Sequence, residues 1–427
     1  MQKSKTSNRR KLNQSKRNKE NLHIYIGKKF DRTHQKEEMA EDRISKLPDA
    51  ILQHILSWID LKQAVQTSIL SKRWKSLWTS LPNLDFNFRR LAVQSGVDLA
   101  WSHHNQSFMP RFMHFVTQFL SQRDHSSNVA KFKLSSSHMA GTDSAFVEKC
   151  LDYAINHGVQ HLDIDAYCYS PPVKFPNGLF ASKSLKELRL RQYIDSIVIP
   201  KSFELPNLKT LCLETFSFND DLYSFSREPF SSFPGLEKLT LHRCQVSGLI
   251  ISAPKLRILE ISFLDPFFSR ELQMELISSP SLTSFRYEGY VSLVCPKMDF
   301  PCLEEVYFDN FAVLEPPYTD DIKTKMPLNL IRMLQQLGNA KFVTLTLDTI
   351  EVLAMDPRLL EQSPSPFPYI KCLKLTKRHN IIHPMKAVPQ TVINYLTKES
   401  SYSDSLVVKF PDGIKGGRPF NSTDGYI

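Results

Sequence analysis

Seven scattered cysteines are the residues of this sequence best suited to covalent or metal chemistry. No two of them form a Cys-x-x-Cys pair, and none stands near histidines at the spacing of a zinc site. The sequence also lacks a Gly-x-Ser-x-Gly nucleophile motif, a His-Glu-x-x-His metal motif and a phosphate-binding loop. Single cysteines of this kind are typical of buried, reduced thiols, and we expect a non-catalytic protein without a cofactor or metal. The cysteines are Cys150, Cys168, Cys212, Cys244, Cys295, Cys302 and Cys372.

The segment of residues 43–84 is dense in apolar side chains and predicts three short helices. Pro48 suits the first turn of the first helix, Asp60 and Gln63 resemble a capping box for the second, and the third begins at Ser71. Three short helices cannot bury so many apolar residues among themselves. They are therefore either the first layer of a larger domain or an interface for another protein. The apolar positions with the period of the first helix are Leu47, Ile51, Leu52, Ile55, Leu56 and Ile59.

The stretch LPDAILQHILSWIDLKQAVQTSILSKRWKSLW resembles the plant form of the F-box, from its Leu-Pro start to its Ser-Lys-Arg-Trp-x-x-Leu-Trp close. This resemblance implies that the apolar surface docks on the Skp-type adaptor of an SCF-type ubiquitin ligase and, through it, on the cullin. Trp74 and Trp78 would hold the three helices together. The residues implied to face the adaptor are Leu47, Pro48, Ile51, Leu52, Ile55 and Leu61.

A Leu-x-x-Leu-x-Leu pattern recurs through most of the remaining chain. Proline stands two residues before the first apolar position in six copies, where it favours an extended entry into a strand. No copy buries its apolar side alone, so neighbours must stack into a leucine-rich-repeat solenoid, and the irregular spacing resembles the F-box/LRR proteins of plants. The copies are VAKFKL (129–134), VQHLDI (159–164), LKELRL (185–190), LKTLCL (208–213), LEKLTL (236–241), LRILEI (256–261), LTSFRY (282–287), LEEVYF (303–308), FVTLTL (342–347) and IKCLKL (370–375).

We therefore predict an α+β protein, a small three-helix F-box followed by a leucine-rich-repeat solenoid with a curved, mostly parallel sheet. A helix over 108–122 would cap the first repeat, and a terminal helix and strand within 388–410 resemble the C-terminal FBD extension of the family. The predicted parts are a disordered basic tail (1–40), the F-box (41–84), a linker with the cap helix (85–128), the repeats (129–380) and a C-terminal cap or tail (381–427).

The concave face of such a solenoid is lined by the residue between the last two apolar positions of each copy. These residues are mixed in charge and size and do not form a basic stripe. This favours a protein target and argues against nucleic acid as a ligand of the folded body. Arg189, Thr240, Glu260, Arg286 and Tyr307 are the candidate target-binding residues. The other residues read as concave are Asp163, Cys212, Thr346 and Lys374.

These features predict the target-recognition subunit of an SCF-type ligase, with the F-box on the adaptor and the solenoid on an unknown target protein. The alternative is a scaffold or adaptor protein, including a nuclear one, that works without the ligase. No apolar run is long enough for a membrane helix.

The net charge of +10 lies in the first 36 residues, where twelve Lys and Arg side chains face two acids. Such a polar, basic segment cannot offset the entropy of ordering and is expected to be disordered. The stretch RRKLNQSKRNK (9–19) has two basic clusters, so the tail is either a nuclear import signal or polyanion contact, or an unstructured leader. We expect the protein in the nucleus, the cytoplasm or both.

Overall fold

The structure is a computed structural model that forms two compact units, Met1–Trp58 and Ile59–Ile427. It describes residues 44–416 except 45, 100–101, 137–140, 169–172, 192–196, 199–204, 218–227, 245, 247, 264–271, 290–292, 311–319, 379–384, 386 and 413. The predicted basic tail therefore lies outside the described residues, and the predicted domain boundaries stay predictions.

The described part of the first unit is built around helix α2 (Asp49–Leu56). Pro48 stands at its N-cap, and Asp49 in the first turn faces the positive end of the helix dipole. Leu52 and Leu56, one turn apart, are buried. The helical period predicted from the sequence is confirmed, but its apolar residues divide into a buried and an exposed set.

The second unit begins with three short helical segments. Helix α3 (Leu61–Gln66) starts at Asp60, whose side chain accepts a hydrogen bond of 3.0 Å from the backbone N–H of Gln63, as the capping box predicts. Helix α4 (Trp74–Leu77) continues as a 3₁₀ turn, η2 (Trp78–Ser80). A further 3₁₀ turn, η1 (Thr67–Ile69), lies between α3 and α4.

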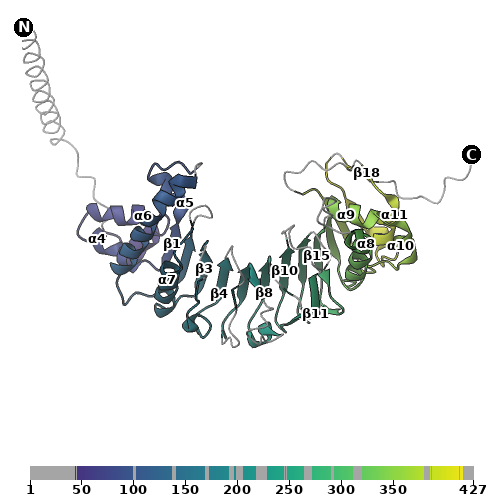
Figure 1. The fold of residues 1–427 in the computed structure, drawn as a ribbon, viewed down its shortest axis with the longest axis horizontal. Coiled ribbons are helices and arrows are strands. Elements are labelled where there is room, and N and C mark those ends of the chain that lie inside the picture. The colour runs from purple at the N-terminus through teal and green to yellow at the C-terminus, as the bar shows by residue number, and fades with distance from the viewer. Residues whose placement is uncertain are drawn as a thin grey trace, which may run out of the picture. The chain divides into compact units, whose positions relative to one another are not determined.

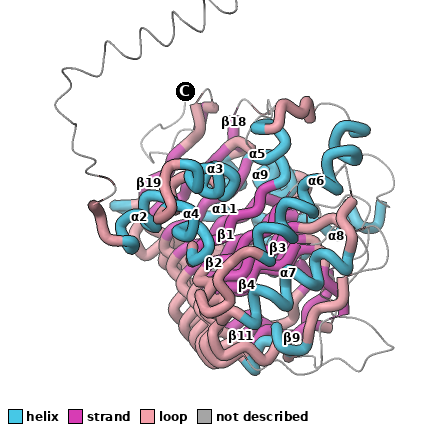
Figure 2. Tube along the Cα trace, turned by 90° about the vertical axis from the view of Figure 1, so that its left-hand side faces the viewer, coloured by secondary structure: helices cyan, strands magenta, loops and turns pink. Residues whose placement is uncertain are grey.

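Twelve parallel strands form the main sheet of the second unit, in the order β1-β2-β3-β4-β6-β8-β10-β12-β15-β16-β17-β19. The sheet is curved (Figure 1), and Figure 2 shows the strands of successive repeats stacked behind one another. The predicted α+β leucine-rich-repeat fold is confirmed. The strands are β1 (Asn83–Asn87), β2 (Lys131–Ser135), β3 (His161–Asp165), β4 (Glu187–Arg191), β6 (Thr210–Glu214), β8 (Lys238–His242), β10 (Ile258–Phe263), β12 (Ser284–Gly289), β15 (Glu305–Asn310), β16 (Phe342–Thr346), β17 (Cys372–Thr376) and β19 (Val407–Lys409).

The repeated leucines align across this sheet. Leu188 pairs with Leu211, and Leu211 with Leu239, in successive strands, and all three side chains are buried. The first, third and fifth residues of each strand point to the opposite face, which follows from the two-residue period of a strand. Burial of one leucine row against the next holds the repeats together.

Two features of the sheet differ from the sequence analysis. An additional strand, β1, precedes the first predicted copy, and its Leu84 and Phe86 are buried like the repeat leucines. In the copy read as FVTLTL, the register places Thr344 opposite Tyr307 and Lys374, so Thr344 is the residue on the concave face. Thr346, read as the middle residue, is instead the fifth residue of β16. It lies on the same side of the sheet as Thr344, but it is buried and caps the following helix, so it offers no surface to a target.

The other elements cover the buried face of the sheet or its ends. The predicted cap helix is α6 (Ser102–Ser121). Helix α7 (Ser144–Asn156) is followed by Gly158, whose φ of +67° is the left-handed conformation common after a helix end. The terminal helix and strand are α11 and β19. The helices are α5 (Phe88–Gln94), α7 (Ser144–Asn156), α8 (Asp320–Gln335), α9 (Leu347–Ala354), α10 (Pro357–Gln362) and α11 (Gln390–Thr397). The 3₁₀ turns are η3 (Asn177–Leu179), η4 (Pro229–Ser232) and η5 (Ser403–Ser405). The smaller sheets are β5 (Ile197–Val198) with β7 (Phe216–Ser217), β18 (Ala387–Val388) with β20 (Lys415–Gly416), and β9 (Leu249–Ser252) with β11 (Leu272–Ser278), β13 (Leu293–Val294) and β14 (Met298–Asp299).

Candidate protein-binding surfaces

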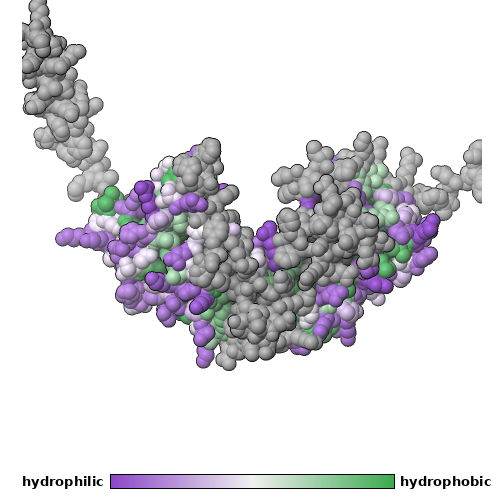
Figure 3. All heavy atoms as spheres, in the orientation of Figure 1, coloured by the Kyte–Doolittle hydropathy of each residue, from purple (hydrophilic) through white to green (hydrophobic). Residues whose placement is uncertain are grey.

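Exposed apolar side chains are concentrated near the start of the described chain. Of the thirteen large hydrophobic residues that are exposed among the described residues, seven lie between residues 44 and 70. On the face seen in Figure 3, hydrophilic side chains cover most of the described surface. Four of the seven belong to the first unit and three to the second, and each group is a candidate for an interaction surface. The seven are Ile44, Ile51, Ile55, Trp58, Ile59, Ile69 and Leu70.

The six residues implied to face the adaptor fall into two groups. Ile51 and Ile55, one turn apart on α2, are 46% and 41% exposed, and Pro48 is exposed beside them. Leu47 is half-buried. Leu52 and Leu61 are buried, so their side chains pack inside the protein and do not form a free contact surface.

The set implied to face the adaptor left out five of the seven exposed residues. Three of these five, Trp58, Ile69 and Leu70, are the most exposed large apolar side chains of the described chain apart from Val93. Their apolar character was visible in the sequence, but a residue type does not show whether its own fold covers it. The adaptor-facing set therefore stays a prediction, and its exposed members are the residues able to contact an adaptor.

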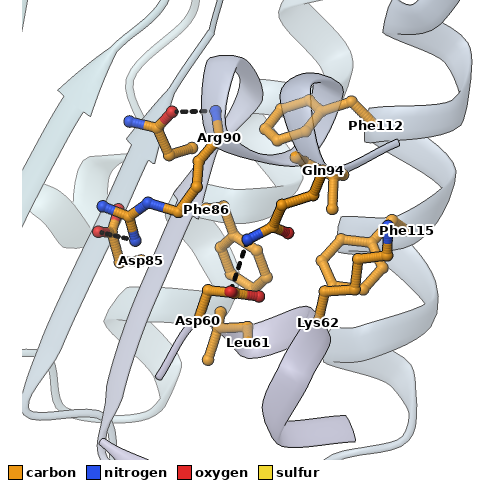
Figure 4. A pocket seen from close by; sticks show the side chains of 11 residues that line it. Asp60, Leu61, Lys62, Asp85, Phe86, Arg90, Gln94, Phe112 and Phe115 are labelled. Atoms are coloured by element: carbon orange, nitrogen blue, oxygen red, sulfur yellow. Dashed lines mark hydrogen bonds and ion pairs between the residues drawn. The ribbon is translucent and has the colours of Figure 1, made fainter. Parts of the chain in front are cut away.

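In the second unit, helix α3 is joined to the first strand and helix of the solenoid (Figure 4). Oδ2 of Asp60 accepts a hydrogen bond of 2.6 Å from Nε2 of Gln94 on α5, while Oδ1 caps α3. Lys62 donates to the hydroxyl of Ser95 at 3.2 Å. The hollow beside these residues is about 20 Å³, room for a single water molecule rather than a ligand. The contacts at this junction serve to fix α3 on the solenoid.

Aromatic packing strengthens the same junction. The ring of Trp78 lies 5.0 Å from that of Phe119 on α6, and Phe119 lies 5.4 Å from Phe86 on β1. Contacts of this kind add about 0.5–1.5 kcal/mol each beyond the area that they bury. Trp78 thus belongs to the core at the start of the solenoid and not to the three short helices alone.

The outward face of the sheet carries a series of ion pairs. Glu187 contacts His161 at 3.0 Å and Arg189 at 2.7 Å. Burial acts to raise the pKa of Glu187, but hydrogen bonds from His161 and Arg189 outweigh it and hold that pKa below its ordinary value. These charged side chains of β3 and β4 are therefore paired with one another within the protein.

The five candidate target-binding residues lie at the middle position of five different strands. Glu260 is half-buried and accepts hydrogen bonds from Lys238 at 2.7 Å and from the Thr240 hydroxyl at 3.0 Å. Thr240 is only 3% exposed, so it supports Glu260 and offers little surface to a target. The guanidinium of Arg286 lies 3.7 Å from the centre of the Tyr307 ring. Arg189, Arg286 and Tyr307 are half-exposed and line the same face.

Metal-ligand clusters and membrane-spanning helices are absent from the described part of the chain. No three His, Cys, Asp or Glu side chains there are grouped so that they could hold a metal ion. No described helix is both long enough and apolar enough to span a membrane.

The chain is similar to known proteins in both its F-box segment and its repeats. Residues 44–86 match the F-box domain family. An F-box/LRR-repeat protein of Arabidopsis thaliana is 31% identical over 324 residues, which cover 74% of this chain and 67% of the relative. Another is 28% identical over 376 residues, which cover 86% of this chain and 70% of the relative. A putative F-box/LRR-repeat protein of the same plant is 29% identical over 79% of this chain and 66% of its own length, so the chain spans about two thirds of these relatives.

Proposed function

Because the chain belongs to the F-box/LRR-repeat proteins, we propose that it is the target-recognition subunit of an SCF-type ubiquitin ligase. The single observation that supports this most is the coincidence of the F-box match at 44–86 with seven of the thirteen exposed large apolar residues. A Skp-type adaptor that covered them would remove this apolar surface from water.

The proposed role is to bind and position and involves no bond-making by this chain. The F-box would tether the chain to the adaptor and, through it, to the cullin, while the solenoid holds a target protein. Bringing the target close to the ubiquitin-charged enzyme raises its effective concentration, which accelerates transfer without a catalytic side chain on this chain.

Co-expression with a Skp-type adaptor tests this proposal. The double variant I51A/I55A truncates two apolar side chains of α2 that are exposed in the chain alone. We expect its affinity for the adaptor to fall at least about ten-fold, because a few apolar side chains that become buried in a complex contribute most of the binding energy. The control is V93A, which truncates an exposed apolar residue outside the matched segment. Failure of the wild-type chain to bind the adaptor would overturn the proposed function, and equal binding by I51A/I55A would overturn the assigned face.

The same proposal includes a place in the cell. The basic segment 1–36 carries the whole net charge of the chain, and import receptors recognise clustered positive charge. We propose that it directs part of the protein to the nucleus. Replacing Arg9, Arg10, Lys11, Lys16, Arg17 and Lys19 with Gln should move a fluorescent fusion from the nucleus to the cytoplasm. An unchanged distribution contradicts this role.

A further inference from the structure

The last three strands of the main sheet carry a surface that differs from the rest of the outward face. In the first position of each strand, Phe342 lies opposite Cys372, and Cys372 opposite Val407. Phe342 and Val407 are 48% and 47% exposed, and the Cys372 side chain between them is partly exposed. These three residues form an apolar row across β16, β17 and β19.

A basic row runs beside it. In the third position of the same strands, which is the middle position of the longer ones, Thr344 lies opposite Lys374, and Lys374 opposite Lys409. Adjacent strands are about 4.8 Å apart, so two like charges stand at directly neighbouring positions of the sheet, which is unfavourable. Both lysines are exposed, and neither has an acidic partner among the residues that the structure describes.

The other charged middle positions are satisfied within the protein. Lys133 contacts Asp163 at 3.8 Å, Arg189 contacts Glu187 at 2.7 Å and Glu260 contacts Lys238 at 2.7 Å. Asp85 contacts Arg90 at 3.3 Å, and Arg286 pairs with Glu288. Lys374 and Lys409 thus bring two uncompensated positive charges together on one face, beside exposed apolar side chains.

We propose that the surface formed by Phe342, Cys372, Val407, Lys374 and Lys409 binds an acidic segment of the target protein that also carries an apolar side chain. The target's carboxylates would lie over the lysine row and relieve its repulsion, while the apolar side chain covers Phe342 and Val407. Because alternate residues of a strand are about 7 Å apart, the acidic and apolar groups of the ligand should be separated by a similar distance. Glu305, opposite Phe342, bounds the surface and disfavours a carboxylate on that side.

This inference specifies the target class of the proposed function and rests on it, but selection of peptides tests it separately. The full chain is exposed to a displayed library of random twelve-residue peptides. We expect peptides with two or more Asp or Glu near a large apolar residue to be enriched. K374Q/K409Q should lose this enrichment, whereas K131Q, which changes an exposed lysine on the same face of β2, should keep it.

The affinity of a selected peptide then separates the two rows. K374Q/K409Q should weaken binding by about 3- to 30-fold, and the loss should shrink at high salt, because exposed ion pairs are weak and screened. F342S should also weaken binding, but with little dependence on salt. A basic or uncharged consensus, no enriched class at all, or equal binding by K374Q/K409Q would overturn the proposal.

Cys372 reports whether the peptide lies on this surface. A bound peptide should slow alkylation of Cys372 by N-ethylmaleimide and leave exposed Cys302 unchanged as an internal control. Unprotected Cys372 at saturating peptide contradicts the location. Adaptor binding by K374Q/K409Q should equal that of the wild type. Failure of the wild type to bind the adaptor would instead remove the proposed function and leave the peptide result intact.

Discussion

Gln94 donates a hydrogen bond of 2.6 Å to the carboxylate of Asp60, although 34 positions separate the two residues. The same carboxylate caps α3 through the backbone N–H of Gln63. One side chain therefore both begins a helix of the matched F-box segment and joins that helix to α5 of the solenoid.

D60A should lower the free energy of unfolding by about 1–2 kcal/mol, because it removes a helix cap and a second hydrogen bond. Q94A removes only the second bond and should cost less than about 1 kcal/mol. Denaturant titrations of both variants measure these losses, with Q66A on the exposed side of α3 as the baseline. If D60A unfolds like Q66A, the carboxylate does not stabilise the junction.

The corrected register of β16 predicts opposite effects for two nearby threonines. Thr346 is buried, and its hydroxyl donates to Asp309 at 2.8 Å, so T346A should cost about 1–3 kcal/mol. Thr344 faces outward, and T344A should change stability by less than about 0.5 kcal/mol. Thermal melts of the two variants decide between the registers, and a larger loss in T344A would restore the original one.

The ion pairs of Glu187 make part of the stability dependent on pH. Its pKa is lower in the folded chain than in the unfolded one, so its contribution is present above the unfolded pKa of about 4.3 and is lost as the pH falls through the folded pKa. E187Q should therefore be less stable than the wild type at pH 7, by less than about 1 kcal/mol, and the difference should shrink at acidic pH. Denaturant titrations across this range measure it, with E361Q on α10 as the reference. A difference that grows toward low pH would contradict the sign.

The thiols should differ widely in reactivity. Burial raises the pKa of Cys150 and of Cys244 to about 12, so both remain protonated thiols at neutral pH. Cys302 is exposed. Mass spectrometry after brief N-ethylmaleimide treatment should find Cys302 modified, and Cys150 and Cys244 modified only after unfolding. C302S should remove the fast reaction, and rapid labelling of Cys244 in the native protein would show that the segment after β8 opens.

The repeated pattern made the fold predictable from the sequence, whereas the register of an individual copy could be misassigned. Phe342 was read as an inward residue because it is apolar, yet it is 48% exposed, and the three inward positions of that copy are Ala340, Val343 and Leu345, all buried. A small alanine at the first inward position does not fit a Leu-x-x-Leu-x-Leu pattern of residue types, so the pattern was matched two residues later, from Phe342. The strand then runs directly into α9, which begins at Leu347 and supplies another buried leucine at a misleading spacing.

The candidate binding surfaces were predicted only in part for a similar reason. Leu52 and Ile51 are adjacent apolar residues of one amphipathic helix, but one is buried and the other exposed. The helical period places the two residues on neighbouring parts of the helix surface. Which part is buried depends on the rest of the chain that packs against the helix. The bond between Asp60 and Gln94 likewise depends on how α5 packs, which no local pattern specifies.

Strand β19 ends the twelve-stranded sheet, and among the described strands it pairs only with β17, through three aligned residue pairs. In a stack where each repeat contacts only its neighbours, such an end strand opens at a lower free energy than the interior strands. Val407 and Lys409 belong to this strand, so a ligand that held them would have to keep it closed. Amide hydrogen exchange of the last repeat would then slow with ligand concentration, and the end of the solenoid would become as rigid as its middle only while a target is held.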